Sequence, residues 1–397
     1  MVIRAVFNLA LLVGVFSLAA CQEKPSVSTE PSVSTDVGTS QAAAPPRPTF
    51  ADMVKINTPL GIVEGAHSPL QFEEGENAEL SDVLNAFSSD SDNYSLIVWH
   101  QGQVLFEKYF DAHTAETRAE SASMHKSVMA LLIGAAIDDG FISNVNESVG
   151  AYIPEWSGDD RGDITIRDLL EMSSGLKPLS SEGGMQSESV QFMGAGEKAR
   201  QTMLGMMLAD EPGTVFHYQN IVSQLLGHII ESATGKAYQD YLSESIWKPI
   251  GASEAKVWFN EPDGFPRTYT GLYAVPRDWL RLGLLVKDNG AWDGKQIVSK
   301  DYVSAMTQAS RANVNYGWQI WRGERYEPLR YYNEKKEGFA VPSSEFFVVD
   351  DLIYFDGFGG QRVYISRSKN LVIVRTGNVK MDWDESKLPN LVISSLP

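Results

Sequence analysis

The strongest hydrophobic pattern inside the chain is the run of residues 127–137, which Gly140 follows after two aspartates. Apolar residues cover almost every side of the helix that this run predicts, and such a helix is normally buried in the middle of a domain. Gly140 is a typical C-terminal stop. Ser123 and Lys126 lie in the turn that opens the helix, so helical spacing places their Cβ atoms about 5–6 Å apart on one face. We therefore predict a buried helix that holds a hydroxyl and an amine together at its beginning.

Strand-like patterns occur near both ends of the chain, bounded by turn residues. These segments are residues 94–99, 104–110, 352–355, 362–366 and 371–375. The first two flank a four-residue connection and predict a hairpin, and the last three predict a meander. Strands at both ends with helices between them predict an α/β (α+β) fold. In it one antiparallel sheet is flanked by helices and carries a mainly helical insertion at about residues 145–270.

Helical spacing of apolar residues predicts several helices between and after these strands. They are residues 164–176 with Thr165 as N-cap and Gly175 as stop, 197–208, 221–234, 278–285, one after residue 299 and a last one at 384–396. The loop at residues 180–185 is rich in Ser, Gly and Glu, and we expect it to be mobile. Tyr218 and Asn220 lie in the tight approach to the helix at 221–234, where a rigid loop can direct a side chain outward.

Charge and residue usage limit the possible functions. The formal net charge is −18, which argues against a nucleic-acid partner, because phosphate binding needs clustered Lys and Arg. No pair of histidines has the spacing of metal ligands, so we expect neither a metal nor another cofactor. No Gly-x-Ser-x-Gly motif occurs, which removes the main sequence support for an α/β-hydrolase.

The N-terminal segment has the order of an export signal. Arg4 precedes a mostly apolar run at residues 5–16, and this run leads to Leu18-Ala19-Ala20-Cys21, which contains the only cysteine. The segment resembles a bacterial lipoprotein signal, which implies cleavage after residue 20 and lipidation of Cys21. An ordinary secretory signal with a free cysteine nearby is the alternative.

The lipoprotein interpretation sets the expected location of the protein. Residues 21–49 are rich in Ser, Thr, Pro and Ala and predict a disordered tether, with the globular part at residues 50–397. Acyl chains on Cys21 would anchor the protein to a membrane without a spanning helix. We therefore expect a periplasmic, lipid-anchored protein, and Gln22 fits outer-membrane sorting by analogy.

Three motifs in order carry a family resemblance. They are Ser123-x-x-Lys126, then Tyr218-x-Asn220 after Pro212-Gly213-Thr214, and then the glycine-rich stretch at residues 357–361. Together, over residues 94–376, they resemble the serine β-lactamase/penicillin-binding-protein superfamily in its class C-like branch, and the resemblance implies a β-lactamase/transpeptidase-like fold. This branch includes family VIII esterases and 6-aminohexanoate-dimer hydrolases. Each motif alone has a plainer interpretation, such as an N-cap serine with a solvated lysine, or a packed core tyrosine.

The resemblance implies a role for each of the matching residues. Ser123 would be the nucleophile, and Lys126 would accept or relay its proton, helped by burial that lowers the pKa of the amine. Tyr218 would be the acid or base for the leaving group, as a phenolate favoured by Lys126. Asn220 would orient Lys126 or the substrate amide.

The glycine-rich stretch would complete the site. The N–H groups of Ser123 and Phe358 would hold the oxyanion, with Gly357, Gly359 and Gly360 shaping the strand end around them. His125 and His217 fall off the predicted catalytic face, and we expect structural roles for both.

One position departs from the pattern of β-lactam-processing relatives, which usually carry Lys-Thr-Gly beside the site. The matching residues here are Phe355-Asp356-Gly357, and Arg375-Thr376-Gly377 comes too late in the chain to replace them. We therefore expect a serine hydrolase that acts through an acyl-enzyme on small esters or amides. A β-lactamase or D,D-peptidase, and a non-catalytic penicillin-recognising envelope lipoprotein, are the alternatives. The segment at residues 322–349, rich in Tyr and Glu, is expected to shape the pocket rim.

Overall fold

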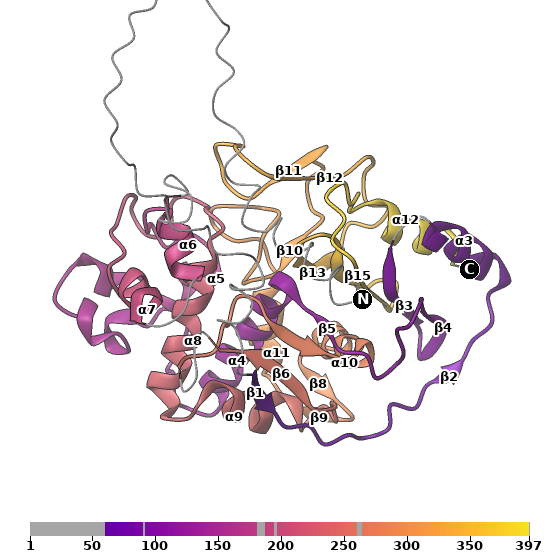
Figure 1. Cartoon of the computed structure of the whole chain (residues 1–397), viewed down its shortest axis with the longest axis horizontal. Helices are drawn as coiled ribbons and strands as arrows, with labels where there is room; N and C mark the ends of the chain where they lie inside the picture. Colours follow the sequence, from indigo (N-terminus) through magenta and orange to yellow (C-terminus); the bar gives the residue numbers. More distant parts are fainter. Residues whose placement is uncertain (1–59, 90–91, 181–186, 194–196, 260–263, 397) are drawn as a thin grey trace, which may run out of the picture.

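The computed structural model describes residues 60–89, 92–180, 187–193, 197–259 and 264–396. The expected signal peptide, Cys21, the tether and nearly all of the 180–185 loop lie outside these ranges. The fold of helices and antiparallel strands that the sequence predicted is confirmed. Figure 1 shows β3 (Asn93–His100) and β15 (Leu371–Gly377), from opposite ends of the chain, on one side of the molecule, and α6 (Glu188–Met193) and α7 (Glu197–Leu204) on the other.

The main sheet of the described residues joins the two ends of the chain. Its strands follow the order β10-β13-β14-β15-β3-β4-β2, and every neighbouring pair is antiparallel except β2 and β4. The bounds are β2 Glu73–Glu74, β3 Asn93–His100, β4 Gln103–Tyr109, β10 Trp321–Arg322, β13 Ile353–Gly357, β14 Gln361–Ser366 and β15 Leu371–Gly377. The predicted hairpin and meander are confirmed, although β13 runs through Asp356 and Gly357, where we expected a turn.

A second, four-stranded sheet was not predicted. Its order is β1-β6-β7-β5, with β1 Leu60–Val63, β5 Ala119–Glu120, β6 Ala255–Trp258 and β7 Leu272–Ala274. The prediction of one sheet was therefore wrong. Each of these strands is only two to four residues long, too short to show a periodic pattern in the sequence.

The predicted buried helix is α4, His125–Asp138, and it lies at the centre of the fold. All its residues from 125 to 136 are buried. It packs against α8 (Asn220–Thr234), α11 (Lys300–Met306) and β13. Gly134 permits the approach of α11, because a Cβ there would lie 2.6 Å from the ring of Tyr302. Gly140 has a φ of 78° and ends the helix region as expected.

The remaining helices surround these sheets. They are α3 Ala78–Ser89, α5 Ile166–Leu170, α6 Glu188–Met193, α7 Glu197–Leu204, α9 Tyr238–Leu242, α10 Pro276–Lys287 and α12 Lys387–Ser394. Short 3-10 helices are η2 Ala122–Met124, η3 Val149–Ala151, η4 Pro154–Trp156 and η5 Asp160–Asp163, and η7 Ser243–Trp247 is a π-helix. α10 packs on β3, β14 and β15. No helix in the described residues has the length and apolar character that a membrane crossing requires.

Three predicted helices end earlier than expected. α5 begins at its predicted cap, where Thr165 and Asp168 form a capping box, but it stops at Leu170 rather than before Gly175. The backbone carbonyl of Leu170 accepts hydrogen bonds from the backbone and side chain of Gln319, so tertiary contacts satisfy a group that would otherwise continue the helix. α7 and α12 are also shorter than the predicted 197–208 and 384–396.

The segment at residues 322–349 contains a small hairpin of β11, Leu329–Tyr331, and β12, Ala340–Pro342. A second hairpin, β8 Ala291–Trp292 with β9 Lys295–Gln296, precedes α11. The first hairpin contacts the loop before α8: the N–H of Tyr218 donates to the carbonyl of Tyr332 at 2.9 Å. The segment at residues 322–349 therefore positions the loop that carries Tyr218.

Candidate active site

Ser123 lies in the η2 turn that leads directly into α4, and Lys126 lies in the first turn of α4. The two side chains meet as predicted, with Lys126 Nζ 2.8 Å from Ser123 Oγ. Lys126 is only 1 % exposed. A buried helix thus aims a hydroxyl and an amine at each other without histidine.

Two further acceptors fix the amine of Lys126. Its Nζ donates to Asn220 Oδ1 at 2.8 Å and to the backbone carbonyl of Tyr269 at 3.0 Å. These oxygens only accept hydrogen bonds, so they take two N–H groups of the amine. A neutral amine then directs its lone pair toward Ser123, where it can accept the hydroxyl proton. Asn220 orients Lys126, one of the two roles implied by the resemblance.

Burial makes the neutral amine available. Loss of solvent lowers the pKa of Lys126 to about 7, although the nearby negative charges of Asp356 and Glu120 act in the opposite direction. A large fraction of neutral amine therefore exists near neutral pH, as expected from the sequence.

Tyr218 comes from the loop before α8 and faces the same amine. Lys126 Nζ lies 4.9 Å from the centroid of the Tyr218 ring, and Tyr316, Trp321 and Tyr332 pack around this ring. The expected phenolate is wrong. Burial and then the neighbouring Tyr316 and Asp356 raise the pKa of Tyr218 well above its ordinary value, and a hydrogen bond with Ser123 only partly offsets them. The residue is a neutral phenol and can donate a proton.

The glycine-rich stretch brings strand β13 against the nucleophile turn. A Cβ on Gly357 would lie 2.5 Å from the carbonyl oxygen of Ser121, so only glycine permits this approach. Gly359 and Gly360 have φ angles of 72° and 89° in the turn that follows. Ser123 lies in η2 and Phe358 directly follows β13, so the approach that Gly357 permits brings the backbone N–H groups of both segments close to each other. These two N–H groups are the candidate donors for an oxyanion that the resemblance implies.

The histidines that adjoin the motifs do not enter the site. His125 Nδ1 contacts the carbonyl of Thr270 at 2.8 Å, and Nε2 contacts the hydroxyl of Tyr238 at 2.6 Å. The backbone N–H of His217 donates to the carbonyl of Met172. These contacts are structural, as predicted. In the described residues no three His, Cys, Asp or Glu side chains form a group that could hold a metal ion.

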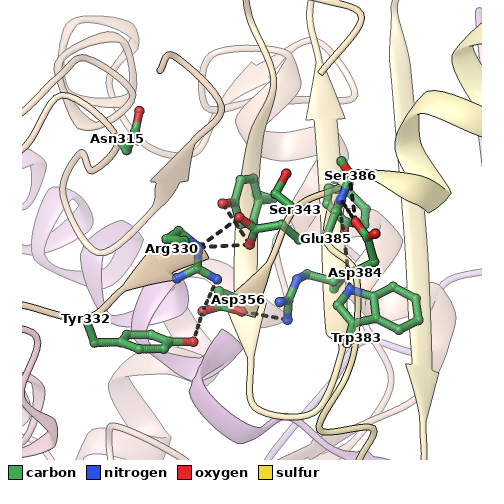
Figure 2. A network of polar contacts seen from close by, with 12 residues as sticks. Asn315, Arg330, Tyr332, Ser343, Asp356, Trp383, Asp384, Glu385 and Ser386 are labelled. Atoms are coloured by element: carbon green, nitrogen blue, oxygen red, sulfur yellow. Dashed lines mark hydrogen bonds and ion pairs between the residues drawn. The ribbon is translucent and has the colours of Figure 1, made fainter. Parts of the chain in front are cut away.

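Asp356, which stands where the β-lactam-processing relatives carry Lys-Thr-Gly, is buried in a network of charged residues that the sequence did not predict. Figure 2 shows Asp356 beside Arg330 and the hydroxyl of Tyr332, which both donate to it. Arg362 forms an ion pair with the other carboxylate oxygen of Asp356. Arg375 lies two strands away, on β15, where its Nε donates to Asn93 Oδ1 at 2.8 Å and its Nη1 donates to the carbonyl of Gly359 at 3.2 Å. Arg375 thus contacts the glycine turn but is not among the residues that line the pocket described next.

A pocket lies against this network and the glycine turn. Its lining includes Tyr332 and Phe339 from the 322–349 segment, together with Asp356, Phe358 and Arg362. The segment therefore contributes to the pocket, as expected. Tyr332 also packs on Tyr218, with ring centroids 5.0 Å apart, so the pocket and the nucleophile site share a wall.

The arrangement is that of proteins in which a lysine, rather than a histidine, activates a serine for acyl transfer. The chain belongs to the Beta-lactamase family, whose model matches residues 87–389.

Curated relatives include hydrolases. The 6-aminohexanoate-dimer hydrolase of Paenarthrobacter ureafaciens is 24% identical over 221 residues, which are 53% of this chain and 56% of the relative. Protein flp of Staphylococcus aureus is 27% identical over 168 residues, 39% of this chain and 33% of the relative. The chain thus spans about half of the first relative and a third of the second.

Solved structures share the fold. A Bacillus anthracis protein provisionally assigned as a 6-aminohexanoate-dimer hydrolase has a TM-score of 0.66 at 20% identity, covering 86% of this chain and 89% of its own. A family VIII carboxylesterase has a TM-score of 0.59 at 16% identity, covering 82% of this chain and 99% of its own. These neighbours fit the branch of the family that the sequence motifs resemble.

Proposed function

We propose that this protein is a serine hydrolase that acts through an acyl-enzyme on small esters or amides. The observation that carries the proposal is the hydrogen-bonded pair of Ser123 and Lys126, in which two fixed acceptors leave the lone pair of a neutral amine for the serine proton. Membership of a family with hydrolase relatives supports it.

The reaction follows from the placement of these groups. Ser123 Oγ attacks the substrate carbonyl carbon and passes its proton to the neutral amine of Lys126. The N–H groups of Ser123 and Phe358 hold the oxyanion, a contribution of about 10²–10³ in rate per donor. Tyr218 gives its proton to the departing alkoxide or amine and regains one from Lys126, which leaves the acyl group on Ser123. Water then attacks this ester by the reverse route, releasing the acid and free serine.

Removal of the nucleophile tests this proposal. Ser123→Ala should lower kcat for p-nitrophenyl butyrate by several orders of magnitude, as removal of other nucleophiles does. Ser127→Ala is the matched control, because Ser127 is a buried serine four residues further on, in the first turn of α4, whose hydroxyl donates to the carbonyl of Gln319 instead. Near-wild-type turnover by Ser123→Ala would contradict the proposal.

A β-lactamase or D,D-peptidase activity is the second candidate within the family. It is disfavoured because a buried phenylalanine, Phe355, and the carboxylate of Asp356 stand where such relatives have Lys-Thr-Gly. Turnover of nitrocefin at a rate comparable to that of the ester would favour this second candidate.

The sequence pattern at residues 1–49 supports a second proposal, that the protein is a lipoprotein anchored in the bacterial envelope through Cys21. The lipid would hold the hydrolase at a membrane, with the Ser- and Pro-rich tether between them. In a bacterial host, Cys21→Ser should move the protein from the membrane fraction to the soluble fraction. An unchanged membrane fraction would contradict the anchor.

A further inference from the structure

The pocket beside Phe358 has a negatively charged group in its wall. Asp356 lines this pocket and is 4 % exposed. Tyr332, Phe339 and Trp383 supply aromatic surface around it. Asp356 is the only charged residue of β13, the strand that meets the nucleophile turn, and the pocket lining also includes two cationic residues, Arg362 and Lys380.

Two arginines form ion pairs with the Asp356 carboxylate. Arg330 Nη2 lies 3.1 Å from Asp356 Oδ2, and Arg362 Nη1 lies 2.6 Å from Asp356 Oδ1. The hydroxyl of Tyr332 donates to Oδ2 at 2.8 Å. Burial alone would raise the pKa of Asp356, but the two arginines hold it below its ordinary value. The carboxylate therefore stays ionised and occupies both guanidinium groups.

The charges of the network are balanced. Glu385 pairs with Arg330 at 2.8 Å, so two carboxylates face two guanidinium groups, as Figure 2 shows around Asp356 and Glu385. Arg362 also lines the pocket, and within the described residues its buried Nε has no hydrogen-bond partner. Arg362 Nη1 also donates to the carbonyls of Gly357 and Gln361 at 2.7 and 2.9 Å. Removal of the Asp356 charge would therefore leave the positive charge of Arg362 without its counter-ion at the pocket.

We propose that Asp356 is a specificity-determining residue: it is an internal counter-ion that neutralises Arg362 in the pocket lining, so that this guanidinium does not recruit a substrate carboxylate and anionic groups are excluded from the pocket. Guanidinium groups bind carboxylates by charge-assisted hydrogen bonds, and a like charge in the same place repels them. The inference deepens the proposed function, and its kinetic test depends on that function. The substrate class becomes esters or amides without a negative charge on the part that enters this pocket.

Two esters of similar size test the exclusion. The wild type should hydrolyse p-nitrophenyl butyrate with at least about tenfold higher kcat/KM than mono-p-nitrophenyl succinate, which adds one carboxylate. In Asp356→Asn the preference should shift toward the succinate by about tenfold or more. A wild type that accepts both esters equally, or a variant with an unshifted ratio, would overturn the proposal.

Formate binding tests the same site without catalysis. Asp356→Asn should gain melting temperature saturably with sodium formate, beyond any effect of sodium chloride at equal ionic strength, and the wild type should not. Asp356→Asn/Arg362→Met is the matched control: it keeps the Arg330–Glu385 pair and charge balance, and it should not respond. A response of the control equal to that of the single variant would overturn the assignment of the arginine.

A second double variant covers the case in which Asp356→Asn does not fold. Asp356→Asn/Arg330→Met retains Arg362 and leaves one arginine with one carboxylate, and it should show the same formate response. If it does not respond, the proposal is wrong. If the wild type hydrolyses neither ester, the proposed function fails, and the formate response alone then decides the role of Asp356.

Discussion

Lys126 shows at the scale of one residue how burial creates reactivity. An exposed lysine is protonated at neutral pH and cannot accept a proton, whereas the pKa of this one is lowered to about 7. The native structure therefore predicts a pH profile. The hydrolysis rate should rise with pH through an apparent pKa of about 7, because only the neutral amine accepts the Ser123 proton.

This profile can be measured as kcat/KM for p-nitrophenyl butyrate between about pH 5 and pH 9. Activity should be low at the acid end, where the ammonium dominates, and level above the pKa. Lys126→Arg, which keeps the positive charge but cannot become neutral, should be inactive throughout the range. A flat profile, or an active arginine variant, would remove Lys126 as the base.

Tyr218 predicts a dependence on the leaving group. Because its pKa is raised well above the ordinary value, it serves as a proton donor. A nitrophenolate leaves without a proton, whereas an amine does not. Tyr218→Phe should therefore lower anilide hydrolysis by about 10²–10⁴ and affect the p-nitrophenyl ester much less. Equal losses on matched butyryl esters and anilides would argue against the donor role.

At the scale of elements, the close approach of β13 to η2 depends on Gly357. Gly357→Ala should destabilise the fold by about 1–3 kcal/mol, because its Cβ would meet the carbonyl of Ser121. It should also lower kcat, since the Phe358 N–H would move with the strand. Gly158→Ala is the matched control, as a Cβ there meets nothing within 4 Å. Chemical unfolding and ester kinetics on both variants measure the difference.

The elements that the sequence predicted are those with a long local pattern. The buried helix α4 and the strands β3, β4, β14 and β15 have enough consecutive apolar residues to show it. The second sheet has strands of two to four residues, and α5 ends where Gln319, far along the chain, takes over its carbonyl. Such features depend on partners that no local pattern contains.

In the candidate site, too, some features could be predicted from the sequence and others could not. Ser123, Lys126, Tyr218 and Asn220 stand in short motifs, so their meeting could be predicted. The carbonyl of Tyr269 has no side-chain signature, and the ionic partners of Asp356, Arg330 and Arg362, come from two other strands, β11 and β14. The ionisation of Tyr218 could not be predicted because it depends on burial and on neighbours that only the folded structure brings together.

At the scale of the whole molecule, the net charge of −18 should repel anionic substrates before they reach the pocket. Salt screens such long-range repulsion, with a Debye length of about 10 Å at 0.1 M. The kcat/KM for mono-p-nitrophenyl succinate should therefore rise with sodium chloride, while that for p-nitrophenyl butyrate stays constant. The same salt response for both esters would show that the net charge does not change the rate at which the anionic substrate reaches the protein.

The most direct test of the central claim is to trap the acyl-enzyme site. A fluorophosphonate probe should add one covalent group to the wild-type protein, and peptide mass spectrometry should place it on Ser123. Ser123→Ala should remain unmodified, and Lys126→Met should react far more slowly. Modification of another residue, or equal labelling of wild type and Ser123→Ala, would contradict the account of Ser123 as the nucleophile activated by Lys126.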